Sequence, residues 1–168
     1  MTLFLIGFMG AGKTTIGKKL AARLGCTFVD LDLVLEGSES KYIRDIIADH
    51  GEEYFRQKES DTLHTLDLLD KVISTGGGTP CFYDNMTWMN ERGITVFLDV
   101  SEGVIFSRLK TVNRENRPLL KGLDDDGLKE FIHLKLDERM PYYTRAKVIF
   151  DPMTQSLNDL AEILASPI

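Results

Sequence analysis

Short apolar runs alternate along the chain with longer segments in which apolar residues recur at helical spacing. The runs are Leu3–Ile6, Phe28–Val29, Val72–Ser74, Thr95–Val100 and a weaker one at Val148–Phe150. A strand that is buried on both faces cannot alternate polar and apolar residues, so near-continuous apolar strands separated by helices are typical of a parallel sheet. The pattern therefore predicts a single α/β layer sandwich.

Helices are expected in the segments around these runs. The first spans Lys13–Leu24 and ends at Gly25, because glycine readily takes the left-handed backbone conformation of a helix C-cap. The others are expected over residues 42–49, 53–70, 83–92, 102–110, 126–140 and 156–165. Between Thr111 and Asp125 the periodicity stops. A long irregular segment is either a functional lid or a solvated surface loop, and composition alone does not separate the two.

The composition is that of a one-domain globular protein that can bury a core without disulfides or metals. Of its 168 residues, 43% are hydrophobic and 27% are charged. The net charge of -6 repels polyphosphate backbones and anionic lipids, so nucleic acids and membranes are not expected partners. Cys26 and Cys81 lack the spacing of a metal or redox site and are expected to be reduced thiols in a cytoplasmic protein. The apolar start is too short for a signal peptide or a membrane span.

The strongest motif lies between the first predicted strand and the first predicted helix. Residues 7–14 read GFMGAGKT, a complete GxxxxGK[ST] phosphate-binding loop in the strand–loop–helix context that the motif requires. Glycines let several backbone N–H groups face one phosphate, Lys13 adds a mobile positive charge, and the Thr14 hydroxyl can join a Mg²⁺ shell. The motif predicts nucleotide binding. A switch GTPase is not expected, because NKxD is absent and the DxxG match at residues 124–127 follows a polar loop.

Two carboxylates, Asp30 and Asp32, alternate at the end of the second predicted strand. Ligands of parallel sheets bind at the carboxyl ends of the strands, so these side chains are expected near the transferring phosphate. One could hold a water of the Mg²⁺ shell, and the other could orient a substrate hydroxyl and accept its proton. Without the phosphate loop, a solvated strand end or a helix N-cap would be the better interpretation.

Candidate anion-binding groups follow further along the chain. Arg56 with Glu59 one turn later suits the capture of a carboxylate or phosphate, although such a pair is more often a weak surface contact. Three glycines at 76–78 follow the third strand and permit a close approach of backbone to a small ligand. Arg117 in the irregular segment and Arg139 near a helix end could also bind anions or be solvated, and spacing does not decide.

Together these residues resemble the shikimate kinase family over nearly the whole chain. The resemblance implies a three-layer α/β/α fold with a five-stranded parallel sheet, like that of P-loop nucleoside monophosphate kinases. It implies one kinase domain over residues 1–168, with a substrate-binding region at about 31–60 and a lid at about 111–125. The implied reaction transfers the γ-phosphate of ATP to the 3-hydroxyl of shikimate on the route to chorismate. ATP and Mg²⁺ would be the cofactors, shikimate the small-molecule partner, and the enzyme a monomer.

The resemblance also implies roles for individual residues. The residues that would bind ATP are Gly10, Ala11, Gly12, Lys13, Thr14, Thr15 and Arg117. Thr14 would bind Mg²⁺, and Asp30 would bind it through water. Those that would bind shikimate are Asp32, Arg56, Gly77, Gly78 and Arg139. Lys13, Asp32 and Arg117 would be catalytic, with Asp32 as the base.

The chain departs from the family after its last predicted strand. Residues 151–156 read DPMTQS, where members of the family often carry an Arg and a Pro around the adenine ring. Gln155 is the nearest positional equivalent of the missing Arg, and Arg108 is an alternative stacking partner.

The phosphate loop would also serve two alternative functions. A kinase of gluconate or of a nucleoside monophosphate would need an acceptor pocket different from the one that Asp32, Arg56 and the glycines suggest. A nucleotide-binding regulator without turnover would not need an Asp that orients a hydroxyl or an Arg in a lid.

Overall fold

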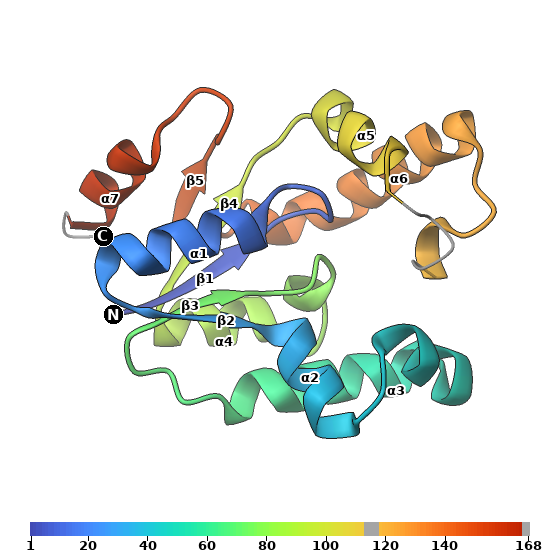
Figure 1. The fold of residues 1–168 in the computed structure, drawn as a ribbon, viewed down its shortest axis with the longest axis horizontal. Helices are drawn as coiled ribbons and strands as arrows, with labels where there is room; N and C mark the ends of the chain where they lie inside the picture. Colours follow the sequence, from blue (N-terminus) through green and yellow to red (C-terminus); the bar gives the residue numbers. More distant parts are fainter. Residues whose placement is uncertain (113–117, 166–168) are drawn as a thin grey trace.

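A sheet of five parallel strands runs through the centre of the computed structural model, which describes residues 1–112 and 118–165 (Figure 1). Its strands are β1 (Thr2–Ile6), β2 (Thr27–Asp30), β3 (Lys71–Ser74), β4 (Ile94–Leu98) and β5 (Val148–Phe150). They lie in the order β2-β3-β1-β4-β5, and each neighbouring pair is parallel. Strand β1 is therefore central, and its residues Leu3–Ile6 are fully buried.

Helices cover both faces of this sheet, so the predicted three-layer α/β/α fold is confirmed. They are α1 (Lys13–Leu24), α2 (Leu31–Glu39), α3 (Ile43–Thr65), α4 (Asn85–Arg92), α5 (Glu102–Lys110), α6 (Asp125–Tyr143) and α7 (Leu157–Ala165). Helix α1 lies in front of the sheet with α7 packed beside it, while α4 and α6 lie behind (Figure 1). None of the helices in the described part of the chain is long and apolar enough to cross a membrane.

Aromatic contacts join the rear layer to the sheet. Trp88 of α4 meets Phe4 of β1 edge to face, with ring centroids 6.1 Å apart. Tyr143 at the end of α6 stacks on Phe97 of β4 at 5.0 Å. Phe4, Phe97 and Tyr143 are buried and Trp88 is partly buried. These contacts fix where α4 and α6 cross the sheet, and so fix the side chains that α6 carries toward the loops.

Helix α2 is the main element that the sequence pattern did not predict. Strand β2 ends at Asp30, which is the N-cap of α2, so Asp32 lies in the first turn of a helix and not at a strand end. Leu31 and Leu35 are both fully buried, and their spacing is that of one helix face. The apolar and polar residues around Asp32 also alternate, and that alternation favoured the strand interpretation.

The predicted helices over 42–49 and 53–70 form one element with a kink. Gly51, with φ 86° and ψ 169°, interrupts α3 at the position where the first of these helices was expected to end. The second one ends earlier than predicted, at Thr65. Leu69 suggested a longer apolar stripe, but its side chain is exposed and the chain has already left the helix.

Smaller differences occur around α4 and α6. The predicted helix over 83–92 begins two residues late, because Tyr83 and Asp84 take left-handed backbone conformations. Helix α6 continues through Pro141 to Tyr143, since a proline in the last turn removes only one backbone bond. The DxxG match is a helix cap, in which the Gly127 N–H donates to the Asp124 carboxylate at 2.8 Å.

The predicted lid is only partly described. Residues 113–117, including Arg117, lie outside the described residues. Thr111 and Val112 follow α5, and Pro118–Leu120 form a short 3-10 helix before α6. Whether the segment closes over a ligand stays a prediction.

The close approach of α1 to the sheet depends on Gly17. A Cβ at this position would lie 2.5 Å from Cε2 of Phe28 and 3.0 Å from Cδ1 of Leu5. We expect Gly17→Ala to lower the free energy of unfolding by about 1–3 kcal/mol, the usual cost of overpacking a core. Gly103→Ala in α5 is the control, because nothing lies within 4 Å of its added Cβ and alanine favours a helix. Urea unfolding checks both variants. A Gly17→Ala protein as stable as wild type would contradict this packing.

Candidate active site

Two adjoining cavities open at the carboxyl ends of the central strands. The phosphate-loop cavity, of about 720 Å³, contains the loop after β1 together with Asp30. The arginine cavity, of about 850 Å³, contains Arg56 and Arg139. Four residues line both cavities: Met9, Asp32, Gly76 and Gly77. A group bound in one cavity can therefore meet a group bound in the other beside the Asp32 carboxylate.

The loop after β1 has the backbone form of an anion-binding nest. Gly7, Gly10 and Gly12 have φ of 139°, 80° and 101°, a region that side chains rarely allow. Gly12 is the N-cap of α1, so unpaired N–H groups and the positive end of the helix dipole meet in the loop. The buried Lys13 donates from Nζ to the carbonyl oxygens of Gly7 and Phe8 at 2.8 and 2.9 Å. The loop thus fits the phosphates of a nucleotide.

Thr14 and Asp30 offer two oxygen atoms next to this loop. The Thr14 hydroxyl donates to Oδ2 of Asp30 at 3.1 Å. Within residues 1–112 and 118–165, no group of three or more His, Cys, Asp or Glu could hold a metal by itself. Magnesium commonly takes only one or two protein ligands and fills its shell with water and phosphate oxygens. The donor set therefore fits Mg²⁺ that is held together with a nucleotide.

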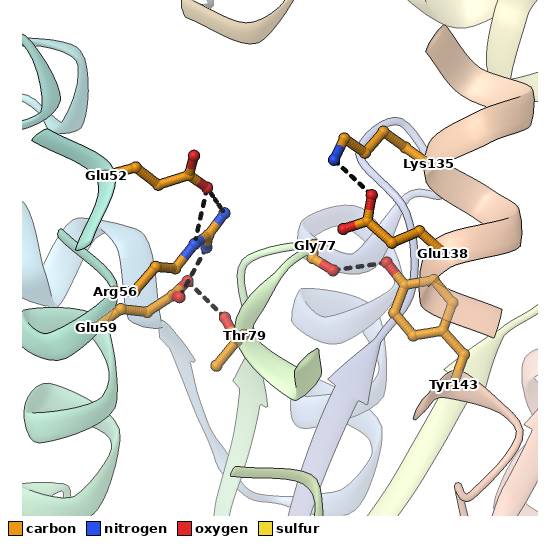
Figure 2. Close-up of polar contacts among 8 residues, drawn as sticks. All are labelled: Glu52, Arg56, Glu59, Gly77, Thr79, Lys135, Glu138 and Tyr143. Atoms are coloured by element: carbon orange, nitrogen blue, oxygen red, sulfur yellow. Dashed lines mark hydrogen bonds and ion pairs between the residues drawn. The ribbon is translucent and has the colours of Figure 1, made fainter. Parts of the chain in front are cut away.

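Arg56 is buried in the wall of the arginine cavity and contacts two carboxylates, as Figure 2 shows. Its Nη1 donates to Oε2 of Glu59 at 2.9 Å. Its Nε and Nη2 both donate to Oε1 of Glu52, at 3.3 and 3.2 Å. Glu59 also accepts a 2.6 Å hydrogen bond from the Thr79 hydroxyl. The predicted pair of Arg56 and Glu59 is thus a buried network and not a surface contact.

Arg139 of α6 provides a second guanidinium in the same cavity. It is 5% exposed and lies over the ring of Phe8 at 5.3 Å. Its Nη1 is the one buried side-chain nitrogen or oxygen in the described part of the chain that has no hydrogen-bond partner. A buried donor without a partner costs free energy, so this atom is a natural binding point for an anion.

The glycines after β3 separate the two cavities and leave no room for side chains. A Cβ on Gly76 would lie 2.4 Å from Oε1 of Glu59, and one on Gly78 would lie 2.7 Å from both Nη atoms of Arg56. A Cβ on Gly77 would lie 3.1 Å from Nη1 of Arg139 and 3.3 Å from the backbone nitrogen of Met9. The three glycines are therefore what lets both arginines and the phosphate loop come together.

Tyr143 anchors the middle of this glycine loop. Its hydroxyl donates to the carbonyl oxygen of Gly77 at 2.6 Å (Figure 2). Burial raises the pKa of the hydroxyl well above its usual value, so the group remains a proton donor. Tyr143 and Arg139 are four residues apart and so lie on one face of α6. One helix thus positions both the guanidinium and the loop beside it.

The Asp32 carboxyl group is partly buried and lies among other acidic side chains, so its pKa is raised. Desolvation is the largest cause, followed by the negative charges of Glu59 and Asp30, while the positive charge of Lys13 acts in the opposite direction. Together they raise the pKa of Asp32 from 3.8 to about 6. A carboxylate with this pKa is still ionised at neutral pH but accepts a proton more readily than an ordinary aspartate.

The lining of the phosphate-loop cavity also includes apolar residues, among them Val112, Pro152 and Leu157. Gln155 lines the same cavity and accepts a hydrogen bond from the Asp151 N–H at 2.8 Å. Arg108 also lines it and donates from Nη1 to the carbonyl oxygens of Gly10 and Ala11, at 2.8 and 3.1 Å. Both side chains thus line the phosphate-loop cavity, and their contacts with adenine stay predictions.

The structure places the predicted site residues, Arg117 apart, around the two cavities. The phosphate-loop cavity is lined by Gly10, Ala11, Gly12, Lys13, Thr14, Thr15, Asp30 and Gln155. The arginine cavity is lined by Arg56, Gly78 and Arg139, and both are lined by Asp32 and Gly77. The arrangement brings the loop after β1, the hydrogen-bonded pair of Thr14 and Asp30, and two buried arginines together around one carboxylate.

Three residues of the site were not predicted from the sequence: Glu36 and Glu52, which line the arginine cavity, and Tyr143, which binds the glycine loop. Glu36 follows Asp32 by one helical turn, and its carboxylate accepts the Ile43 N–H at 2.9 Å, so recognising α2 would have found it. Glu52 precedes Arg56 by one turn and could have been found from helical spacing. Tyr143 gave no signal, because its partner is a backbone carbonyl distant in sequence.

The pKa of Asp32 can be measured directly. We expect the carboxyl ¹³C resonance of Asp32 in the free protein to titrate near pH 6. Because the folded pKa is raised, the ionised carboxylate destabilises the fold, and this cost grows as the pH rises from about 4 through 6. The stability of Asp32→Asn relative to wild type should therefore be higher at pH 8 than at pH 4. An Asp32 resonance that titrates near pH 4 would contradict the burial described above.

Comparisons with known proteins agree on one family. The sequence profile for shikimate kinase matches residues 9–166. A shikimate kinase from Bacteroides fragilis is 46% identical over 165 residues, covering 98% of this chain and 90% of that protein. The crystal structure of the shikimate kinase from Bacteroides thetaiotaomicron is 42% identical, with a TM-score of 0.90 over 98% of each chain. That of the shikimate kinase from Acinetobacter baumannii in complex with shikimate is 32% identical, with a TM-score of 0.84 over 97% of this chain and 89% of that one. This chain belongs to the shikimate kinase family.

Proposed function

We propose that this protein transfers the γ-phosphoryl group of ATP to the 3-hydroxyl of shikimate, giving shikimate 3-phosphate. Family membership supports this activity, and so does a relative of known structure that binds shikimate. The observation that carries the proposal is the position of Asp32 where the two cavities meet, with the unpartnered Arg139 Nη1 in the arginine cavity. We also expect a cytoplasmic monomer that uses Mg²⁺.

The donor side rests on the phosphate loop. Gly10, Ala11 and Gly12 would bind the phosphates of ATP through backbone N–H groups, with Thr15 close to them at the start of α1. Lys13 would leave its carbonyl partners to neutralise charge on the β and γ phosphates. Mg²⁺, held by Thr14 and through water by Asp30, would supply further neutralisation of the phosphate oxygens. Arg117 would add a positive charge from the lid, and Gln155 would contact the base.

The acceptor side rests on two arginines and one carboxylate. Arg139 would donate from Nη1 to the carboxylate of shikimate, with Arg56 and the backbone of Gly77 and Gly78 around it. These contacts would fix the shikimate ring, so that one of its hydroxyl groups can reach Asp32 at the boundary with the phosphate-loop cavity. Asp32 would orient the 3-hydroxyl and accept its proton late, because the transition state of phosphoryl transfer is loose.

Asp32→Asn tests the catalytic role. We expect turnover with ATP, Mg²⁺ and shikimate to fall by at least about a hundredfold, because a positioned base contributes roughly 10²–10⁴-fold. Stability at pH 8 should not fall, because the variant removes a partly buried charge whose ionisation costs free energy. Asp67→Asn, which changes an exposed carboxylate in the connection before β3, is the matched control. Wild-type turnover by Asp32→Asn would remove Asp32 from the mechanism. If the wild-type protein phosphorylates gluconate or AMP faster than shikimate, the proposed substrate is wrong.

Arg139→Ala tests recognition of the acceptor. It should weaken shikimate binding by about 1.5–3 kcal/mol, the worth of a hydrogen bond to a charged group, and leave ATP affinity nearly unchanged. Arg139 suits this test better than Arg56, whose removal would leave the buried Glu59 without its cation. Calorimetric titration with each ligand separates the two effects. Equal losses for ATP and shikimate would contradict the assignment of the two cavities.

A further inference from the structure

Two glutamates contact Arg56, and they differ sharply in exposure. The side chain of Glu59 is 1% exposed, whereas that of Glu52 is 56% exposed. Figure 2 shows Glu59 beneath the guanidinium next to Thr79, and Glu52 on the other side, one turn earlier on α3. Glu59 is therefore a fixed partner of Arg56, while Glu52 has free access to water.

The orientation of Arg56 does not depend on Glu52. Glu59 binds Nη1 at 2.9 Å and is itself held by Thr79 at 2.6 Å. The rings of Phe55 and Phe82 lie 4.8 and 4.6 Å from the guanidinium carbon, and Gly78 packs against the same group. These buried contacts fix the guanidinium. The exposed i,i+4 pair with Glu52 adds only a few tenths of a kcal/mol at most.

Glu52 nevertheless occupies the part of Arg56 that suits a carboxylate ligand. Its Oε1 accepts from both Nε and Nη2, which form one edge of the planar guanidinium. With Glu59 on Nη1, a single positive charge faces two negative charges. The acidic residues Asp32, Glu36, Glu52 and Glu59 line this cavity together with the basic residues Arg44, Arg56 and Arg139. An anionic acceptor that enters the cavity therefore meets one more acidic than basic side chain unless Glu52 moves away.

We propose that Glu52 is an internal competitor for the carboxylate of the acceptor, occupying the Nε–Nη2 edge of Arg56 until the acceptor displaces it. The proposal rests on the proposed function, since it assumes an acceptor with a carboxylate. The exposed Glu52 side chain can turn into water at little cost, whereas Glu59 cannot. Glu52 therefore lowers the affinity for shikimate and selects for acceptors whose carboxylate can replace it.

Glu52→Gln isolates the charge, because glutamine keeps the size of the side chain. We expect it to bind shikimate about three to ten times more tightly than wild type in calorimetry at low salt, the range expected for removing a weak pair and a nearby like charge. Its affinity for the uncharged methyl ester of shikimate should stay within about twofold of wild type, because that ligand does not compete for the edge.

Glu53→Gln is the matched control. It changes the net charge by the same amount at the neighbouring position, but the Glu53 carboxylate accepts from the Tyr83 hydroxyl and not from Arg56. Its shikimate affinity should stay within about twofold of wild type. If Glu52→Gln binds shikimate as wild type does, or more weakly, Glu52 supports Arg56 and does not compete. An equal gain in shikimate affinity in both variants would show that the effect comes from net charge alone, and it would overturn the proposal. If folded wild type does not bind shikimate, the proposed function fails, and this inference fails with it.

Discussion

The site depends on a backbone segment that has no side chains. Gly76, Gly77 and Gly78 lie between the two cavities, and an added Cβ on any of them would meet a charged side chain within 3.1 Å. This close packing lets Glu59, Arg56 and Arg139 approach the phosphate loop. A larger residue at Gly77 or Gly78 would push against one of the arginines, and one at Gly76 would push against Glu59. The distance between donor and acceptor is thus set by glycine backbone.

Buried charges around this segment differ in how well they are compensated. Arg56 and Glu59 neutralise each other at 2.9 Å, and Thr79 accounts for the remaining oxygen of Glu59. Arg139 keeps one nitrogen without a partner, and Asp32 is ionised with difficulty. Burial of unpaired or like charges is costly to folding. Here that cost falls on the two groups that we expect to contact the acceptor, which suggests that stability has been given up for binding and proton transfer.

Much of the fold could be predicted from the sequence, and the reason is visible in the elements themselves. Strands buried on both faces left near-continuous apolar runs, and GFMGAGKT is a motif of eight consecutive residues that can be recognised without knowledge of distant contacts. Helix α2 was missed because the first turn after Asp30 alternates like a strand, and its helical spacing appears only with Leu35. The proximity of Arg139 to Gly77 follows from the path of α6 behind the sheet, which no local pattern encodes.

A crystal structure with shikimate, Mg²⁺ and a non-hydrolysable ATP analogue would show whether acceptor and donor meet at Asp32. We expect the 3-hydroxyl of shikimate within about 2.6–3.2 Å of an Asp32 oxygen, in line with the γ-phosphate, and the shikimate carboxylate on Nη1 of Arg139. A complex in which shikimate lies in the arginine cavity with its carboxylate toward Asp32, or outside that cavity, would contradict it.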